Sequence, residues 1–215
     1  MHVDGISDQP GSGPAVLSAA AEAALCTIAG RVSMSSGGPD VPVAVVHART
    51  AGEVAATVRL ARRERLGIAV LGAGRPAAGS GQIAVDVTAL DAVTIDAGLA
   101  IAVVQISASA ADVSAAAAEH DLRPGADLLA VEMVTADGSL VTATRADAPE
   151  LIWAIGAGRT GAAGFAIVTA RTLRLRSRPP AGGAMTPPRV TRPDPARWMR
   201  VRAAWDPELV FAQHA

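Results

Sequence analysis

The sequence of 215 residues is marked first by what it lacks. It contains no lysine and no tyrosine, one cysteine, and only 2% aromatic residues. A single cysteine excludes an intramolecular disulfide framework and is typical of a reducing compartment. Because large side chains are scarce, the core must consist of tightly packed small aliphatic residues. We expect Cys26, which lies among alanines, to be one of the small buried residues.

Charge and apolar runs exclude further classes of protein. The 19 basic and 20 acidic residues give a net charge of −1, so no overall charge directs the chain to nucleic acid or to a membrane surface. The apolar runs are shorter than the roughly 18 residues of a membrane-spanning helix. The first thirty residues lack the basic start of a signal peptide. We therefore expect a cytoplasmic protein, with no nucleic-acid or membrane partner. The four histidines show no metal-ligand spacing, so no metal site is expected.

Turn-rich and periodic segments predict how the chain is organised. The expected parts are a disordered lead-in at residues 1–13, a main domain at 14–176 with subdomains at about 14–98 and 99–176, a linker rich in proline and glycine at 177–194, and a C-terminal helix and tail at 195–215. We expect the arginines between residues 189 and 202 to form a solvated tail.

Local signals place several elements within the main domain. Thr50-x-x-Glu53 and Ser109-x-x-Asp112 are capping-box patterns that predict helix starts. Gly67 is expected to end the first of these helices in the C′ position. Asp137-Gly138 lies between two apolar segments and predicts a tight hairpin turn rather than a catalytic carboxylate.

One loop of small residues carries most of the chemical information. An apolar strand at 68–71 precedes it, and a second apolar strand follows at 83–87. Glycines in such a loop let backbone N–H groups converge on a phosphate, although an ordinary tight loop between strands remains the alternative. Gly72-x-Gly74-x-x-Ala77 also matches the dinucleotide fingerprint, which requires a helical crossover to a parallel strand. Because only residues 78–82 separate the loop from the next strand, we expect no crossover and no nicotinamide cofactor.

With its flanks, the loop resembles the FAD-linked oxidases, the group of vanillyl-alcohol oxidase, berberine-bridge enzyme and p-cresol methylhydroxylase. In that family an apolar strand leads to Arg-Gly-Gly-Gly-His-Ser, a further glycine and a strand that ends Val-Ile-Asp-Leu-Ser. The segments that carry the resemblance lie between about residues 40 and 176, at 42–54 (PVAVVHARTAGEV), 71–79 (LGAGRPAAG), 85–88 (VDVT), 130–138 (AVEMVTADG), 151–155 (LIWAI) and 165–169 (FAIVT). The segment WDPELVF at 205–211 is similar to the family's C-terminal Tyr-Asp-Pro-Asn-x-Phe.

The resemblance implies a fold, a cofactor and a set of binding residues. The fold would be an α+β fold of the FAD-binding PCMH type, with two subdomains and a short C-terminal tail. The cofactor would be FAD. The residues that would contact it are Gly72, Ala73, Gly74, Arg75, Pro76, Ala78, Gly79, Phe165, Ala166 and Ile167.

The chain departs from the family at positions that bear on chemistry. Arg75 stands where many members carry the histidine that bonds covalently to the flavin, so we expect non-covalent FAD. A glycine-rich stretch that packs along the flavin in the family is missing between Gly125 and Ala126. The linker at 178–193 stands where family enzymes carry a substrate domain, so the chain resembles a truncated member reduced to its cofactor half. No tyrosine is present to act as a base, and no catalytic residue is assigned.

Two functions remain open. The first is an FAD-dependent oxidoreductase that oxidises a small alcohol, amine or sugar-like substrate. The second is a non-catalytic remnant or interaction module, including one half of a split flavoenzyme. In that case a homodimer or a partner chain would cover the face on which a substrate domain would dock.

Overall fold

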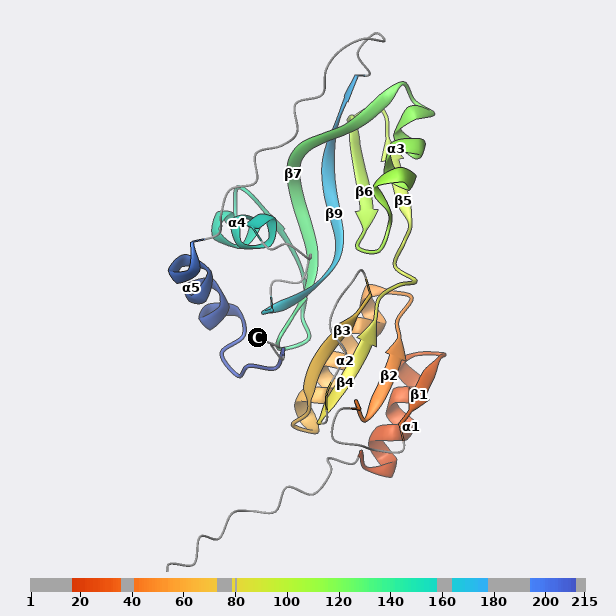
Figure 1. Cartoon of the computed structure of the whole chain (residues 1–215), viewed down its shortest axis with the longest axis vertical. Helices are drawn as coiled ribbons and strands as arrows, with labels where there is room; N and C mark the ends of the chain where they lie inside the picture. The colour runs from red at the N-terminus through yellow and green to blue at the C-terminus, as the bar shows by residue number, and fades with distance from the viewer. Residues whose placement is uncertain are drawn as a thin grey trace, which may run out of the picture.

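The computed structural model describes residues 17–35, 41–72, 79, 81–157, 164–177 and 194–211. In these residues, five helices accompany two β-sheets, and the expected α+β fold is confirmed. Figure 1 shows the two sheets one beyond the other along the long axis of the molecule. No helix in these ranges is long and apolar enough to cross a membrane.

The first sheet has the strand order β1-β2-β4-β3. Strands β2 (Ala44–His47), β4 (Gln82–Asp86) and β3 (Gly67–Leu71) are parallel, and β1 (Val32–Met34) pairs antiparallel with β2. Helix α1 (Ala19–Ile28) packs against α2 (Ala51–Arg63). The predicted apolar face of α2 is buried, because the side chains of Val54, Val58 and Ala61 have no exposed surface. Cys26 on α1 is exposed, so the expectation of a buried cysteine is wrong.

The expectation about the connection between β3 and β4 is also wrong. The two strands are adjacent and parallel, with Gly67 opposite Gln82 and Leu71 opposite Asp86. Residues 72–81 therefore return the chain from the carboxyl end of β3 to the amino end of β4. A parallel connection usually takes about a dozen residues, but strands of this length need a return of only about 13 Å. A segment of this size spans that distance, so the shortness of the connection does not itself exclude a nicotinamide cofactor.

Helix α2 ends differently from the expectation. Thr50 caps its start, since its hydroxyl accepts the N–H of Glu53, as predicted. At the other end Arg65, not Gly67, takes the left-handed conformation, with φ of 56°. The N–H of Leu66 then bonds to the carbonyl of Ala61, the six-residue link of a Schellman motif. Gly67 is free to begin β3.

The second sheet has the strand order β5-β6-β9-β7-β8, and all its pairs are antiparallel. Its strands are β5 (Val93–Asp96), β6 (Ile101–Gln105), β7 (Leu122–Thr135), β8 (Leu140–Thr144) and β9 (Ala166–Ser177). Helices α3 (Ala110–Ala118) and α4 (Pro149–Ala157) lie beside it. Because β5 belongs to this sheet, the sheet includes residues from Val93 onward.

Strand β7 runs without interruption through the place where the glycine-rich stretch is missing. It pairs with β9 from Leu122 to Thr135, with register shifts between Pro124 and Leu128, between Leu128 and Ala130, and after Glu132. Gly125 lies so close to β9 that a Cβ atom there would be 2.7 Å from the carbonyl oxygen of Arg174. The strand therefore leaves no loop at the position where the resembled family has one.

The two sheets share one hydrophobic core. It extends from Val58 of α2 and Ile83 of β4 to Met133 of β7 and Phe165 beside β9. The predicted turn at Asp137-Gly138 joins β7 to β8, as expected. It also docks on α2, because Nη1 of Arg59 donates to the carbonyl oxygen of Gly138 at 2.6 Å.

The C-terminal residues return to the first sheet. Helix α5 (Pro195–Trp205) packs on α4, and the N–H of Ile68 in β3 donates to the carbonyl of Val210 at 2.7 Å. Arg197 makes two bonds to Glu150 and stacks 4.0 Å from the ring centroid of Trp153. The expectation of a solvated arginine tail is therefore wrong for α5. Arg189 and Arg192 lie outside the described residues.

Candidate functional site

Three parallel strands of the first sheet end side by side. His47 closes β2, Leu71 closes β3 and Asp86 closes β4, and the pairing places Asp86 opposite both of the others. In sheets with parallel strands, ligands bind outside the carboxyl ends, where the loops leave the strands. This edge is where the loop of small residues begins.

Gly72, the first residue of that loop, has a conformation that requires glycine. Its φ is 116°, a region that other residues rarely adopt. A Cβ atom there would lie 3.3 Å from Cγ2 of Thr88 and 3.5 Å from Cγ2 of Val87. The backbone can therefore pass close to Thr88 only because residue 72 has no side chain.

A polar network fixes the same edge. Nδ1 of His47 lies 2.8 Å from Oδ2 of Asp86, and Oδ1 of Asp86 accepts the N–H and the hydroxyl of Thr88 at 2.9 and 2.7 Å. Nε2 of His47 lies 3.3 Å from Oγ of Ser33 on β1. Burial raises the pKa of Asp86, but the bonds from Thr88 and His47 together outweigh it, so the net shift is downward. The carboxylate is thus held ionised with its oxygens already occupied.

Sequence reasoning gave His47 no role. The residue closes an apolar strand, and its partner Asp86 closes another strand 39 positions later. The ends of two parallel strands are a signal for a shared site, but it could be read only after the two strands were known to be parallel neighbours.

The predicted loop residues fall partly within the described ranges. Gly72 lies at the carboxyl end of β3, and the N–H of Gly79 donates to Oε1 of Gln82 at the start of β4. The described ends of the loop are thus attached to opposite ends of the strand pair. Five of the predicted contacts lie outside the described residues, namely Ala73, Gly74, Arg75, Pro76 and Ala78.

The second predicted group lies at the start of β9. Phe165, Ala166 and Ile167 are buried in the shared core, with side chains at most 2% exposed. Ala166 and Ile167 also pair with the end of β7. The predicted contact of these three residues with the cofactor stays a prediction.

Comparison with known proteins identifies the family of the residues that form this edge. Residues 42–148, which contain β2, α2, β3, β4 and the loop of small residues, match a family described as FAD binding domain. These residues belong to the FAD binding domain family. The resemblance inferred from the sequence motifs is confirmed, and the cofactor of the domain is FAD. None of the curated proteins compared with the chain matches it.

Solved structures share the fold. The 6-hydroxy-D-nicotine oxidase of Arthrobacter nicotinovorans is 22% identical, with a TM-score of 0.53 over 71% of this chain and 40% of the oxidase. Phl p 4.0202, a glucose dehydrogenase, is 16% identical, with a TM-score of 0.59 over 74% of this chain and 44% of the dehydrogenase. A berberine-bridge-enzyme-like protein of Physcomitrella patens is 18% identical, with a TM-score of 0.57 over 73% and 44%. The chain spans less than half the length of these proteins.

The described residues of the FAD binding domain fit a phosphate-bearing cofactor. Gly72 lets the backbone pass Thr88 closely because it has no Cβ atom, and glycine-containing loops of this kind can present main-chain N–H groups to an anion. The nearby carboxylate of Asp86 is engaged by Thr88 and His47. Among the ranges described, no group of three or more histidine, cysteine or acidic residues is placed to hold a metal ion.

Proposed function

We propose that this chain holds FAD without a covalent bond, as the flavin-binding part of an FAD-linked oxidoreductase. The observation that carries the proposal is Gly72, whose positive φ opens the loop at the carboxyl end of β3 within the matched family residues. Main-chain N–H groups of residues 72–79 would meet the pyrophosphate. Arg75 would add a fixed cation.

Each part of the edge has a role in this proposal. Gly72 lets the backbone approach the pyrophosphate, and Gly79 holds the other end of the loop through Gln82. The pair of His47 and Asp86 keeps the ends of β2 and β4 in register. When bound, the flavin itself supplies acceptance of a hydride from a substrate such as a small alcohol, amine or sugar-like compound. The contribution of the chain is binding, orientation and electrostatics.

The residues at the attachment position support non-covalent binding. Arg75 stands where the resembled family carries its histidine. The one cysteine, Cys26, lies on α1 and is exposed, and α1 precedes the matched residues. The flavin would then be held by hydrogen bonds and charge alone.

A second function, flavin binding without turnover, has one observation in its favour. Strand β7 continues through the position where a glycine-rich stretch would pack along the flavin, with a register shift against β9 between Pro124 and Leu128, so that this wall of the site would be missing. Catalysis requires walls that exclude water and orient the substrate. In this second function, a homodimer or a partner chain would cover the face on which a substrate domain would dock. Bleaching of the flavin absorbance by a small alcohol, amine or sugar in the FAD-loaded chain alone, without oxygen, separates the two functions, because only the first includes reduction of the flavin by a substrate.

Titration of FAD into the flavin-free protein, followed by flavin fluorescence, tests the proposed site. Gly74→Val should weaken binding at least about a hundredfold, because a branched side chain pushes the N–H groups away from the phosphates. Arg75→Ala should weaken it about tenfold, the loss of one charge-assisted hydrogen bond of roughly 1.5 kcal/mol.

Gly30→Val is the matched control. Gly30 lies between α1 and β1, and a Cβ atom there would meet no atom within 4 Å. Its affinity for FAD should equal that of the parent protein. Equal affinity in Gly74→Val and the parent would overturn the proposal, since the loop would then be only a connection between strands.

A further inference from the structure

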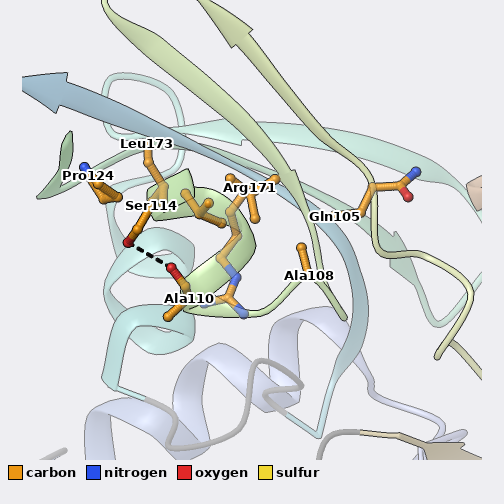
Figure 2. Close-up of a pocket in the computed structure, with 9 residues that line it drawn as sticks. Gln105, Ala108, Ala110, Ser114, Pro124, Arg171 and Leu173 are labelled. Carbon is orange, nitrogen blue, oxygen red and sulfur yellow. Dashed lines mark hydrogen bonds between the residues drawn. The ribbon is translucent and has the colours of Figure 1, made fainter. Parts of the chain in front are cut away.

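A cavity of about 250 Å³ lies between α3 and the second sheet. Its walls are mostly apolar, with Val104 from β6, Val113 from α3, Pro124 from β7 and Leu173 from β9. Figure 2 shows the side chain of Arg171, also from β9, extending among these walls toward α3. None of the residues predicted to contact FAD lines this cavity.

Among the described residues, Arg171 is the one charged residue in the lining, and none of the others pairs with it. The structure gives its guanidinium no hydrogen bond and no ion pair with any described residue. Other arginines near the surface are paired, such as Arg176 with Asp127 and Arg197 with Glu150. Desolvation by burial lowers the pKa of Arg171, and no acidic group offsets this cost. An apolar cavity therefore contains a cation without its counter-charge.

The other two polar side chains that line the cavity each make a hydrogen bond elsewhere. Oε1 of Gln105 accepts the N–H of Ala92 at 2.9 Å, and in Figure 2 the amide points away from Arg171. The hydroxyl of Ser114 donates to the carbonyl of Ala110 at 2.8 Å. The start of α3 is closed by its own capping box. Binding in the cavity would thus be directed by Arg171 and by the apolar walls.

We propose that this cavity binds a small monocarboxylate with a short aliphatic body. The planar guanidinium presents two parallel N–H donors that match the two oxygens of a carboxylate. The aliphatic body would lie against Val104, Val113 and Leu173, where its burial is favourable. A single cation balances a monoanion, whereas a phosphate dianion would be left with an uncompensated charge.

Hexanoate is the probe, and calorimetric titration of the purified full chain is the measurement. The parent protein should bind hexanoate, and 1-hexanol should bind about tenfold or more weakly, because it lacks the charge that pairs with Arg171. Arg171→Gln should lose about tenfold or more in affinity for hexanoate, and Arg171→Lys should lose less. Arg174→Gln is the control, because Arg174 is an exposed residue of the same strand outside the lining. Its affinity should match that of the parent.

The outcomes separate this site from the flavin site. Ala108→Leu adds bulk to the lining without removing charge and should abolish binding of hexanoate while circular dichroism stays unchanged. Equal binding of hexanoate and hexanol, or unchanged binding in Arg171→Gln, would overturn the proposal. Loss of hexanoate binding on saturation with FAD would also overturn it, since the cavity would then belong to the flavin site. Equal hexanoate affinity in FAD-loaded and FAD-free protein would support a separate site.

Discussion

At the scale of single residues, the turn at Asp137 and Gly138 holds the two sheets together. Gly138 has φ of 79° and its carbonyl accepts Arg59 of α2. A Cβ atom there would overlap the Arg59 side chain and lie 2.9 Å from the carbonyl oxygen of Ala55. The glycine is therefore needed both for the turn and for its contact with α2.

Gly138→Ala should lower the free energy of unfolding by about 3 kcal/mol, the sum of left-handed strain and overpacking against α2. Urea unfolding measures the change. Gly98→Ala is a suitable control, because a Cβ atom at Gly98 would be 3.5 Å from its nearest neighbour, Oδ1 of Asp96. Similar stabilities for the two variants would contradict the role of Gly138.

Asp137 makes the turn sensitive to pH. Hydrogen bonds from the hydroxyl of Thr135, and then from Ser139, lower the pKa of Asp137 from 3.8 to about 2. The folded pKa lies below the unfolded value, so this stabilisation is present above about pH 4 and is lost as the pH falls toward 2. Because Asp137 is exposed and screened by solvent, we expect about 1 kcal/mol. Asp137→Asn should remove this part of the acid dependence in denaturation measured at pH 3 and pH 7; an unchanged acid dependence would contradict it.

At the scale of elements, the C-terminal segment depends on a buried carboxylate. Asp206 accepts the N–H of Val210 at 2.7 Å and that of Phe211 at 3.2 Å. Burial raises the pKa of Asp206, although these two bonds partly oppose the shift. The turn they form directs the carbonyl of Val210 toward Ile68 of β3.

Asp206→Ala should release this segment from β3. Hydrogen exchange at the amide of Ile68 reports it directly, because that N–H donates to Val210. We expect exchange to become about tenfold faster or more, as the turn loses two hydrogen bonds to a charged group. Glu208→Gln is the control, since its pair with Arg62 is exposed and its loss should leave Ile68 protected. Protection of Ile68 in Asp206→Ala equal to that of the parent would show that the segment does not need the carboxylate.

Local features such as helix caps were predictable from the sequence. Which strands pair and which distant side chains meet was not. The caps at Thr50 and Ser109 depend on residues three positions apart, and both form as expected. Whether β3 and β4 run parallel depends on tertiary pairing, which the pattern of either strand does not contain. The same reason explains why the bond between His47 and Asp86 was missed. The ion pair of Arg197 required knowing that α5 packs on α4.

At the scale of the whole molecule, the FAD domain was recognisable because its motifs occur in order along the chain. The site that these motifs build was only partly predictable. Phe165 and Ile167 are buried in the core, and their contact with FAD stays a prediction, because an apolar run after a glycine has the same pattern beside a cofactor as in a core.

The manner of flavin attachment is tested on the intact protein. If FAD is held by Arg75 and the loop alone, acid precipitation should release all of the flavin into the supernatant. The absorbance of the supernatant and of the redissolved pellet measures the division. Colour that remains in the washed pellet would show a covalent bond and contradict the proposal for Arg75.

The bridge between Ile68 and Phe211 has a consequence for synthesis of the protein. The first sheet is translated early, but the edge of β3 gains its last partner only when the segment around Phe211 has emerged from the ribosome. Until then the nascent chain exposes an unpaired strand edge, which can recruit other strands. Chains that stop before residue 210 should therefore aggregate during expression, even though every strand of both sheets has been made.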